Sequence, residues 1–299
     1  MKFELIGRSE ELEHIEACLR VHRHVLLEGP VGVGKTTLAL AVTERMRLPV
    51  FRIDGDGRYS EQKLTGWFDP PKAIQVGYLP AAFVPGPLVE AMYAGGVLLI
   101  NELNRLPEGV QNILLPAMDE RKIIVPRLGE VRAEAGFRVI ATQNPKEFVA
   151  TSHLSEAILD RFELISLDYQ SELEEMDIVL SHMAESALGK SDCLRLAAIA
   201  VQIVRATRVD PCIRRGASVR AAIGIAEIAT ALLATGIDFE LAVTKAVLMA
   251  LPTRIEMERH LEGLEGPKDI KNSGWLSELT RVTLAQNAVE LKKKTDLVS

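Results

Sequence analysis

The feature that most constrains this chain is a glycine-rich segment between a short apolar run and a helix-forming run. Residues 24–28 read HVLLE, residues 29–36 read GPVGVGKT, and TLALAVTERM follows. The segment has the form G-x-x-x-x-G-K-T, in which the glycines let backbone N–H groups converge on phosphate oxygens. The lysine of such a segment reaches the β and γ phosphates, and the next hydroxyl ligates Mg²⁺. The pattern therefore predicts a site for ATP and Mg²⁺ on a strand–loop–helix unit.

Each residue of this loop is a candidate nucleotide contact, with Lys35 on the phosphates and Thr36 on the metal. The alternative is a glycine-rich turn that happens to precede a helix. That alternative explains neither the Lys-Thr pair nor its position between a strand and a helix. Nucleotide binding alone does not establish hydrolysis. The residues predicted to bind the nucleotide are Gly29, Pro30, Val31, Gly32, Val33, Gly34, Lys35, Thr36 and Thr37.

The chain around the loop alternates between apolar strand patterns and helical patterns as far as residue 168. Such alternation is typical of an α/β fold, a parallel sheet covered by helices. Strands are expected at 24–29, 50–54, 96–100, 137–142 and 162–167.

Beyond residue 168 the strand patterns stop, and apolar residues recur at three- and four-residue spacing, as on one face of a helix. We therefore expect two domains, an α/β nucleotide-binding domain over 1–168 and an all-helical domain over 169–299. The helical patterns cover 172–187, 193–207, 218–234 and 238–250.

Composition and charge exclude several classes of protein. The net charge of -6 does not favour a surface built to neutralise nucleic-acid phosphates, so nucleic acid is not an expected partner. Three widely spaced cysteines without a CxxC pair indicate neither a disulfide framework nor a zinc cluster. The first residues lack the apolar run of a signal peptide, and the most apolar stretch, 221–236, is shorter than a bilayer span. We expect a cytoplasmic chain without a membrane span.

Further segments, taken in order, resemble the AAA+ ATPases and, among these, the MoxR family most closely. LIGRSEEL at 5–12 resembles the opening segment of the family, and 29–37 its Walker A loop. Residues 97–121, VLLINELNRLPEGVQNILLPAMDER, resemble the Walker B strand and the helix after it, where the family usually has an Asp-Glu pair. The resemblance covers nearly the whole chain.

Three more site residues are implied by this resemblance. VIATQNP at 139–145 resembles the sensor 1 segment and points to Asn144. LSEAILDRF resembles the segment that ends in the arginine finger and points to Arg161, which would serve a neighbouring subunit. RGASVRAAI resembles the sensor 2 motif and points to Arg220, with Val219 where the family usually has proline. The alternative to these roles is that Asn144 only forms a turn and that the two arginines lie in ion pairs at the surface.

The resemblance also implies an architecture. It is a P-loop AAA+ module whose five-stranded parallel sheet, of order 5-1-4-3-2, is sandwiched by helices, with a smaller helical lid that carries sensor 2. The family assembles as a homo-hexameric ring with nucleotide at the subunit interfaces. Two insertions are expected, around 76–88 and as a hairpin over 122–140, and in a ring they would face the pore or a partner. Either can equally be a plain surface hairpin.

Asn101 and Glu102 form the most informative departure from the family pattern. Asn101 stands where an aspartate usually positions the Mg²⁺, and it keeps a carbonyl oxygen while losing the negative charge. Weaker magnesium binding is the direct expectation. By resemblance, Glu102 is the residue that polarises the attacking water. Two hypotheses remain open: the chain hydrolyses ATP slowly, or it binds ATP as a conformational switch with hardly any hydrolysis. Asn101 can also be a residue that only packs at the end of a strand, which is compatible with both hypotheses.

As a member of the MoxR family, the chain would be a chaperone-like remodelling ATPase. The resemblance implies a von Willebrand factor A domain protein as partner and a metalloenzyme as client. Residues 100–112, INELNRLPEGVQN, look nearest to the branch associated with carbon monoxide dehydrogenase maturation. A DNA-translocating motor would need basic loops, and the expected hairpin is only mildly basic. A small-molecule kinase would leave the lid arginine and the finger segment without a purpose.

Overall fold

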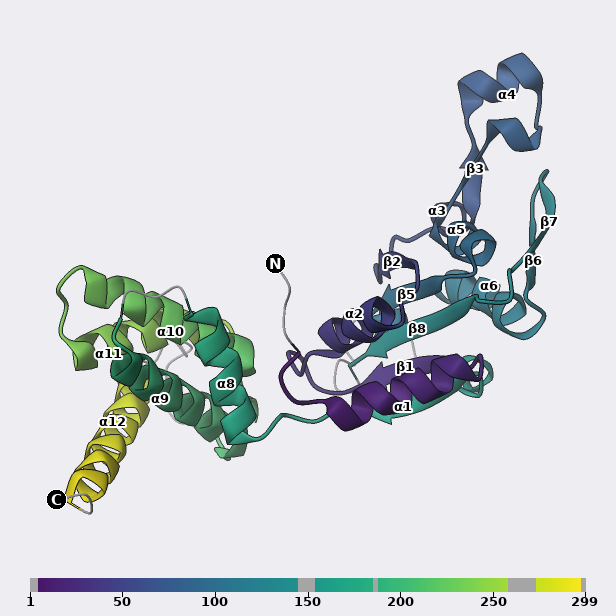
Figure 1. The fold of residues 1–299 in the computed structure, drawn as a ribbon. Coiled ribbons are helices and arrows are strands. Elements are labelled where there is room, and N and C mark those ends of the chain that lie inside the picture. The colour runs from purple at the N-terminus through teal and green to yellow at the C-terminus, as the bar shows by residue number, and fades with distance from the viewer. Residues whose placement is uncertain (1–4, 145–153, 185–187, 258–272, 297–299) are drawn as a thin grey trace. The chain divides into compact units, whose positions relative to one another are not determined.

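The computed structural model describes residues 5–144, 154–184, 188–257 and 273–296. The chain divides into two compact units, residues 1–168 and residues 169–299 (Figure 1). The first unit holds the parallel sheet and the second is helical.

The sheet of the first unit has five strands in the order β2-β5-β8-β1-β9, and every neighbouring pair is parallel. Numbered within the sheet along the chain, this order is the predicted 5-1-4-3-2, so the predicted α/β fold is confirmed. The strands are β1 (His24–Glu28), β2 (Val50–Asp54), β5 (Val97–Asn101), β8 (Arg138–Gln143) and β9 (Phe162–Ser166).

The three central strands form the core of this unit because the side chains in the middle of each are apolar and buried on both faces. Leu26, Leu99 and Ile140 have no more than 2% of their surface exposed. The two edge strands are less buried, and each has exposed positions among its five residues. The expected strand ranges differ from the observed ones by only a residue or so at either end.

Helices cover the sheet: α1 packs on β1 and β9, α2 on β5 and β8, and α5 on β2 and β5 (Figure 1). The first helix starts at Ser9, yet Ser9 does not cap it. The residue before it, Arg8, has a left-handed backbone (φ 64°), and its guanidinium bonds Glu11. The helices of this unit are α1 (Ser9–Arg20), α2 (Lys35–Arg45), α3 (Glu61–Thr65), α4 (Pro70–Val76), α5 (Pro87–Ala94), α6 (Glu108–Asp119) and α7 (Glu156–Leu159), with 3-10 turns η1 (Pro80–Ala82) and η2 (Leu103–Arg105).

Two antiparallel hairpins are inserted into this unit. One pairs β3 (Gly66–Phe68) with β4 (Phe83–Pro85) and carries α4 at its tip, away from the sheet (Figure 1). It begins about ten residues before the expected range of 76–88, because Gly66 pairs back onto Pro85. The other pairs β6 (Lys122–Val125) with β7 (Gly129–Arg132) and is shorter than 122–140, since Arg138 already belongs to the sheet.

The second unit packs its helices around a core of alanine, valine, isoleucine and leucine. It also contains one short antiparallel ladder, so the expectation of an all-helical domain was wrong at this point: Asp210 ends a helix, and Ile213 then pairs with Met257. No helix in the described part of the chain is long and apolar enough to cross a membrane. The elements are α8 (Glu172–His182), α9 (Lys190–Val209), β10 (Ile213–Arg215), α10 (Val219–Ala234), α11 (Phe239–Ala250), β11 (Glu256–Met257) and α12 (Ser273–Asp296).

Candidate nucleotide site

The glycine-rich loop connects the carboxyl end of β1 to the amino end of α2, and its shape depends on glycine. Gly32 and Gly34 have φ values of 82° and 88°, in the left-handed region that other residues rarely adopt. Gly29 is required for a different reason, because a Cβ there would lie 2.2 Å from the backbone oxygen of Leu167. The loop thus needs glycine at three positions directly before the start of α2, and a helix start of this kind favours a phosphate.

Lys35 lies over this loop. Its Nζ donates to the backbone oxygens of Gly29 and Pro30, at 2.7 and 2.8 Å. The ammonium group is thus held against the first two residues of the loop, directly after β1. A bound phosphate would offer a charged acceptor in place of neutral carbonyls, and charge-assisted hydrogen bonds are the stronger ones.

Thr36, Asn101 and Asp54 form a hydrogen-bonded row across the ends of α2, β5 and β2. The Thr36 hydroxyl donates to Asn101 Oδ1 at 2.6 Å, and Asn101 Nδ2 donates to Asp54 Oδ1 at 2.8 Å. On its other side, Thr142 Oγ1 donates to Asn101 Oδ1 at 3.3 Å. The carbonyl oxygen of Asn101 therefore faces the hydroxyl of the P-loop helix.

Asp54 is a carboxylate held in its ionised form. The hydrogen bond from Arg52 is the largest effect and lowers the pKa of Asp54. Burial opposes it, and the hydrogen bond from Asn101 lowers the pKa further by a smaller amount. Arg52 lies on the solvent side of Asp54, with Nη2 2.8 Å from Oδ1. The negative charge that Asn101 lacks is consequently present on the adjacent strand.

Glu102 leaves β5 with a left-handed backbone, φ 55° and ψ 57°. Its N–H donates to Thr142 Oγ1 at 3.0 Å, and its carboxylate pairs with Arg105 at 2.8 Å. Gly55 packs so tightly on this turn that a Cβ would lie 2.1 Å from the Glu102 backbone oxygen. A non-glycine residue in this region is unusual and is held by its surroundings. The Glu102 side chain is 41% exposed.

These oxygen atoms fit a magnesium ion. Mg²⁺ takes oxygen ligands and keeps several waters, usually beside one or two carboxylates and the phosphates of its nucleotide. Thr36 and Asn101 would supply two neutral protein oxygens, with the Asp54 carboxylate behind the amide. The donor set suits a metal bound mainly through water and phosphate.

The other three predicted residues lie in different places. Asn144 follows β8 directly and is buried at the same carboxyl edge of the sheet as the P-loop and Asn101. Arg161 precedes β9 at the opposite edge, where its Nε donates to Asp119 at 2.6 Å. Arg161 therefore cannot reach the P-loop of its own chain. Arg220 is an exposed residue in the first turn of α10, in the second unit.

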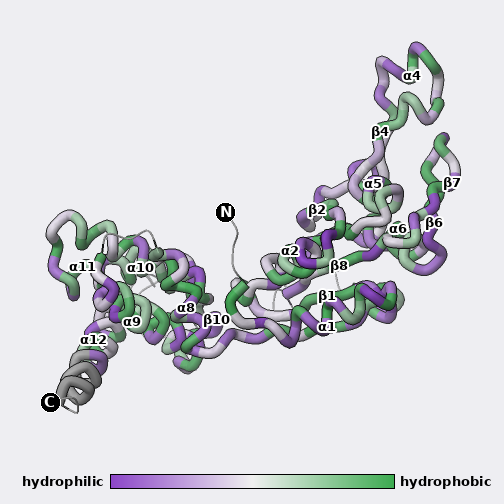
Figure 2. The backbone as a smooth tube through the Cα atoms, in the orientation of Figure 1, coloured by the Kyte–Doolittle hydropathy of each residue, from purple (hydrophilic) through white to green (hydrophobic). Residues whose placement is uncertain are grey.

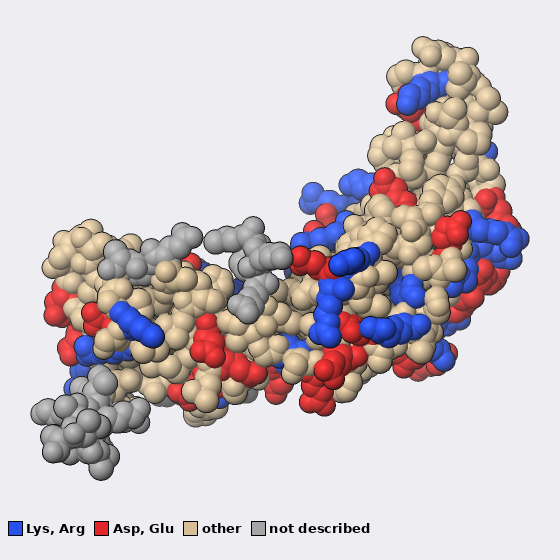
Figure 3. Space-filling view, in the orientation of Figure 1, with Lys and Arg blue, Asp and Glu red and all other residues tan. Residues whose placement is uncertain are grey.

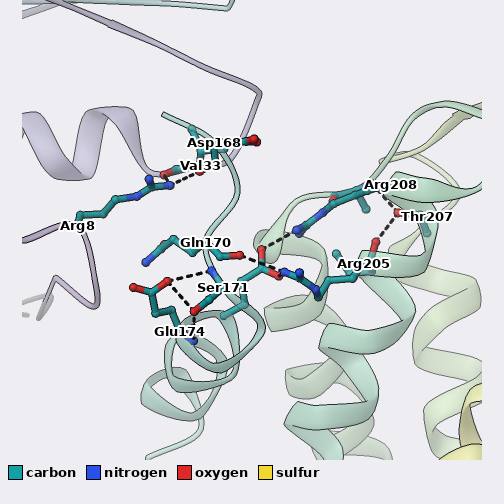
Figure 4. Close-up of polar contacts among 12 residues, drawn as sticks. Arg8, Val33, Asp168, Gln170, Ser171, Glu174, Arg205, Thr207 and Arg208 are labelled. Atoms are coloured by element: carbon teal, nitrogen blue, oxygen red, sulfur yellow. Dashed lines mark hydrogen bonds and ion pairs between the residues drawn. The ribbon is translucent and has the colours of Figure 1, made fainter. Parts of the chain in front are cut away.

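Arg8 is a residue that the sequence did not single out. Its guanidinium donates to the backbone oxygens of Val33 in the P-loop and of Asp168 after β9 (Figure 4). These bonds fix the loop to the end of the first unit. Asp54 was also missed. It is the last residue of β2, as Asn101 is the last residue of β5, and a comparison of the two strand ends in the sequence could have identified it.

In the second unit, a buried ion pair supports the segment that leads to Arg220. Glu175 is buried and pairs with Arg208 at 2.8 Å and Arg205 at 3.2 Å (Figure 4). Arg208 Nε donates to the backbone oxygen of Ala217. The backbone N–H of Ala217 in turn donates to Thr207 Oγ1 at 2.9 Å. These contacts set the start of α10 and so the position of its first turn.

Comparison with known families finds a match over most of the unit that holds this site. Residues 24–162 match the model described as AAA domain (dynein-related subfamily). An uncharacterized protein of Staphylococcus epidermidis is 28% identical over 257 residues, spanning 85% of this chain and 94% of that protein. An uncharacterized protein of Staphylococcus aureus is 32% identical over 179 residues, spanning 59% and 66%.

Many solved structures share the fold, among them the following two. The Holliday junction branch migration motor RuvB of Thermotoga maritima is 18% identical, with a TM-score of 0.54, over 82% of this chain and 70% of that one. NtrX of Brucella abortus in complex with ADP is 18% identical, with a TM-score of 0.55, over 80% and 53%.

Proposed function

We propose, from the premise that residues 24–162 form an AAA+ ATPase domain, that this chain binds Mg·ATP at the P-loop and hydrolyses it slowly. The observation that carries this proposal is the 2.6 Å contact between Thr36 and Asn101, with Glu102 next to it. It joins the metal-binding hydroxyl to an oxygen donor, and the following residue is an acid at the sheet edge. Glu102 polarises the attacking water, while the neutral Asn101 weakens the hold on the metal.

Phosphate release by Glu102→Gln protein tests this role. Loss of a catalytic base typically costs about 10²–10⁴ in rate, so turnover should fall at least that far while ATP binding persists. Glu108→Gln is the matched control, because Glu108 is an exposed acid nearby, in the first turn of α6. A wild-type protein that binds ATP but releases no phosphate would contradict slow hydrolysis and favour the nucleotide-gated switch.

We further infer that the chain works as a homo-hexameric ring in which Arg161 acts on the ATP of a neighbour. The placement of Arg161 at the sheet edge opposite its own P-loop supports this role, as does its salt bridge to Asp119, which holds it at the unit's surface. Asn144 acts beside the nucleotide as sensor 1. Arg220 acts from the lid as sensor 2, on its own subunit's ATP or on a neighbour's.

A mixing experiment tests this arrangement. An arginine finger is worth about 10³–10⁵ in rate, so Arg161→Ala protein alone should be almost inactive. Glu102→Gln protein alone should be inactive as well. When the two are mixed, sites that combine an intact Glu102 with a neighbour's intact Arg161 should recover activity. A mixture no more active than its components would contradict action across the interface.

The function we propose for the ring is the remodelling of a protein client, of the MoxR type. A von Willebrand factor A domain protein would be its partner and a metalloenzyme its client, in the cytoplasm. The exposed tip of the α4 insertion supports a protein client, because Ile74, Tyr78 and Leu79 are 87%, 52% and 55% exposed. Figure 2 shows the apolar residues of this insertion. Stimulation of phosphate release by the partner is the test.

A DNA motor, the function in the name of RuvB, is less well supported by the surface. Two of the basic residues around the β6–β7 hairpin are paired with acids, Lys122 with Glu120 at 2.9 Å and Arg132 with Glu130 at 2.5 Å. Figure 3 shows acidic and basic side chains interspersed over the visible face of this unit. Binders of nucleic acid usually gather lysine and arginine without such pairing.

A further inference from the structure

Asp54 and Asn101 end two neighbouring strands at the same level. They are register partners in the parallel pair of β2 and β5, and their side chains meet at 2.8 Å. The backbones are joined directly after them, because the N–H of Gly55 donates to the Asn101 backbone oxygen at 2.7 Å. Gly55 also has no space for a side chain. The two residues are therefore held against each other by the sheet and by the turn that follows it.

This contact decides which way the Asn101 amide faces. The hydroxyls of Thr36 and Thr142 both lie near the amide, but a hydroxyl can donate or accept and would tolerate either orientation. An ionised carboxylate only accepts. Asp54 therefore requires the NH₂ group on its own side, which leaves Oδ1 directed at Thr36.

The same contact places a negative charge directly behind a neutral ligand. Asn101 offers one oxygen without charge, and the nearest carboxylate in the row is that of Asp54. The ion pair of Asp54 with Arg52 does not remove this charge from the site, because both side chains are solvent-exposed, at 65% and 46%, and exposed pairs are weak. Groups that orient a metal ligand in this way typically change metal affinity by about 10–100-fold.

We propose that Asp54 is a positioning residue for magnesium at the nucleotide site. It orients the Asn101 side chain so that the carbonyl oxygen is available to the metal. It also supplies a negative charge next to Asn101, where other P-loop sites carry that charge on the ligand itself. This inference rests on the proposed binding of Mg·ATP. The inference adds that the carboxylate of this site lies at the end of β2, on Asp54, and not at the end of β5.

The test measures the affinity for a non-hydrolysable ATP analogue by calorimetry, once with Mg²⁺ and once with EDTA. The ratio of the two dissociation constants reports the contribution of the metal. In Asp54→Asn protein the ratio should fall about tenfold, while the affinity in EDTA stays unchanged. Asp56→Asn, which removes an exposed charge two residues away, is the matched control and should leave the ratio as in wild type.

The decisive protein is the double variant Asp54→Asn/Asn101→Asp. It keeps one carboxylate and one amide in contact, with the carboxylate now facing Thr36, so the metal contribution should return at least to the wild-type level. An Asp54→Asn ratio equal to that of wild type, or a double variant weaker than Asp54→Asn, would overturn the proposal.

Failure of the proposed function would look different. Wild-type protein would then bind the analogue equally well in Mg²⁺ and in EDTA, or Lys35→Ala would bind it as tightly as wild type. Either result removes the Mg·ATP site, and the role of Asp54 with it. If only the role of Asp54 is wrong, the ratio of dissociation constants in wild-type protein stays large, and Lys35→Ala protein still loses affinity for the analogue.

Discussion

The hydroxyl of Thr36 donates a 2.6 Å hydrogen bond to the side-chain oxygen of Asn101, and this bond joins the first turn of the P-loop helix to the end of the central strand β5. Two oxygens that close together, from elements that the sheet fixes in place, define where a cation would be shared. Because neither oxygen is charged, the affinity for the metal depends on geometry and on the nucleotide phosphates.

Thr36→Ala should therefore weaken nucleotide binding only when Mg²⁺ is present. We expect a loss of about tenfold or more in affinity with Mg²⁺, as is typical when a group that holds or orients a metal is removed, and none in EDTA. Thr36→Ser keeps the hydroxyl and should bind as wild type does. Calorimetric titration provides the measurement. An equal loss in Mg²⁺ and EDTA would mean that Thr36 contacts the nucleotide rather than the metal.

Gly29→Ala should destabilise the first unit. The new Cβ would lie 2.2 Å from the backbone oxygen of Leu167, a part of the chain that cannot move aside as a flexible side chain could. Forcing an atom into a filled space costs about 1–3 kcal/mol, which urea unfolding can measure. Gly57→Ala is the control, because nothing lies within 4 Å of its added Cβ and no left-handed backbone strains it. Equal unfolding midpoints for the two variants would contradict this account.

The sequence predicted the central part of the first unit well. Each of its central strands contains a short run of consecutive apolar residues. Such a run is what a parallel strand needs when both of its faces are buried, so the run itself predicts the strand. The P-loop was found because one short segment supplies the whole phosphate cradle. The end of β5 and the turn after it were placed correctly for the same reason, since they are contiguous in sequence.

Contacts between distant segments could not be predicted in the same way. Asp54 is 47 residues from Asn101, and only the order of the strands brings the two together. The β3–β4 insertion was placed too late because its first strand, Gly66–Phe68, is three residues long and carries no periodic signal. The β10–β11 ladder was missed for the same reason, because its strands are three and two residues long.

Glu175→Gln should destabilise the second unit. Glu175 is 2% exposed and Arg208 is 10% exposed, so the change leaves a largely buried guanidinium without its countercharge. Breaking a buried pair from one side typically costs about 3–5 kcal/mol of unfolding free energy. Glu172→Gln removes the same charge from an exposed position in the first turn of the same helix, and it should cost less than about 1 kcal/mol.

The stabilities of the Glu175→Gln and Glu172→Gln proteins are compared by thermal or urea unfolding of the full chain, monitored through a signal specific to the second unit. The Glu175 variant should also loosen the segment before α10, because Arg208 holds the Ala217 oxygen. Faster amide exchange at Ala217 would report that loosening. Equal unfolding midpoints for the two variants would show that the pair contributes little.

The stability of the first unit should depend on the protonation of His24. Burial lowers its pKa to about 4 from 6.5, with Arg121 and Arg138 adding to the effect, while a backbone hydrogen bond at Met118 and the charge of Asp119 oppose it. The neutral ring is also required by geometry, because the Val139 N–H donates to Nδ1 at 2.9 Å and that nitrogen must be unprotonated.

The direction of the pH effect follows from these values. Between about pH 6.5 and pH 4 the unfolded chain binds a proton at His24 that the folded chain does not. This contribution to stability is fully present above pH 6.5 and is lost as the pH falls toward 4, by about 3 kcal/mol in total. His24→Asn keeps an acceptor for Val139 but does not titrate, so its unfolding free energy should fall less steeply over this range. His14→Asn, at an exposed position in α1, is the control and should keep the wild-type slope. Identical slopes for wild type and His24→Asn would show that His24 is not the group responsible.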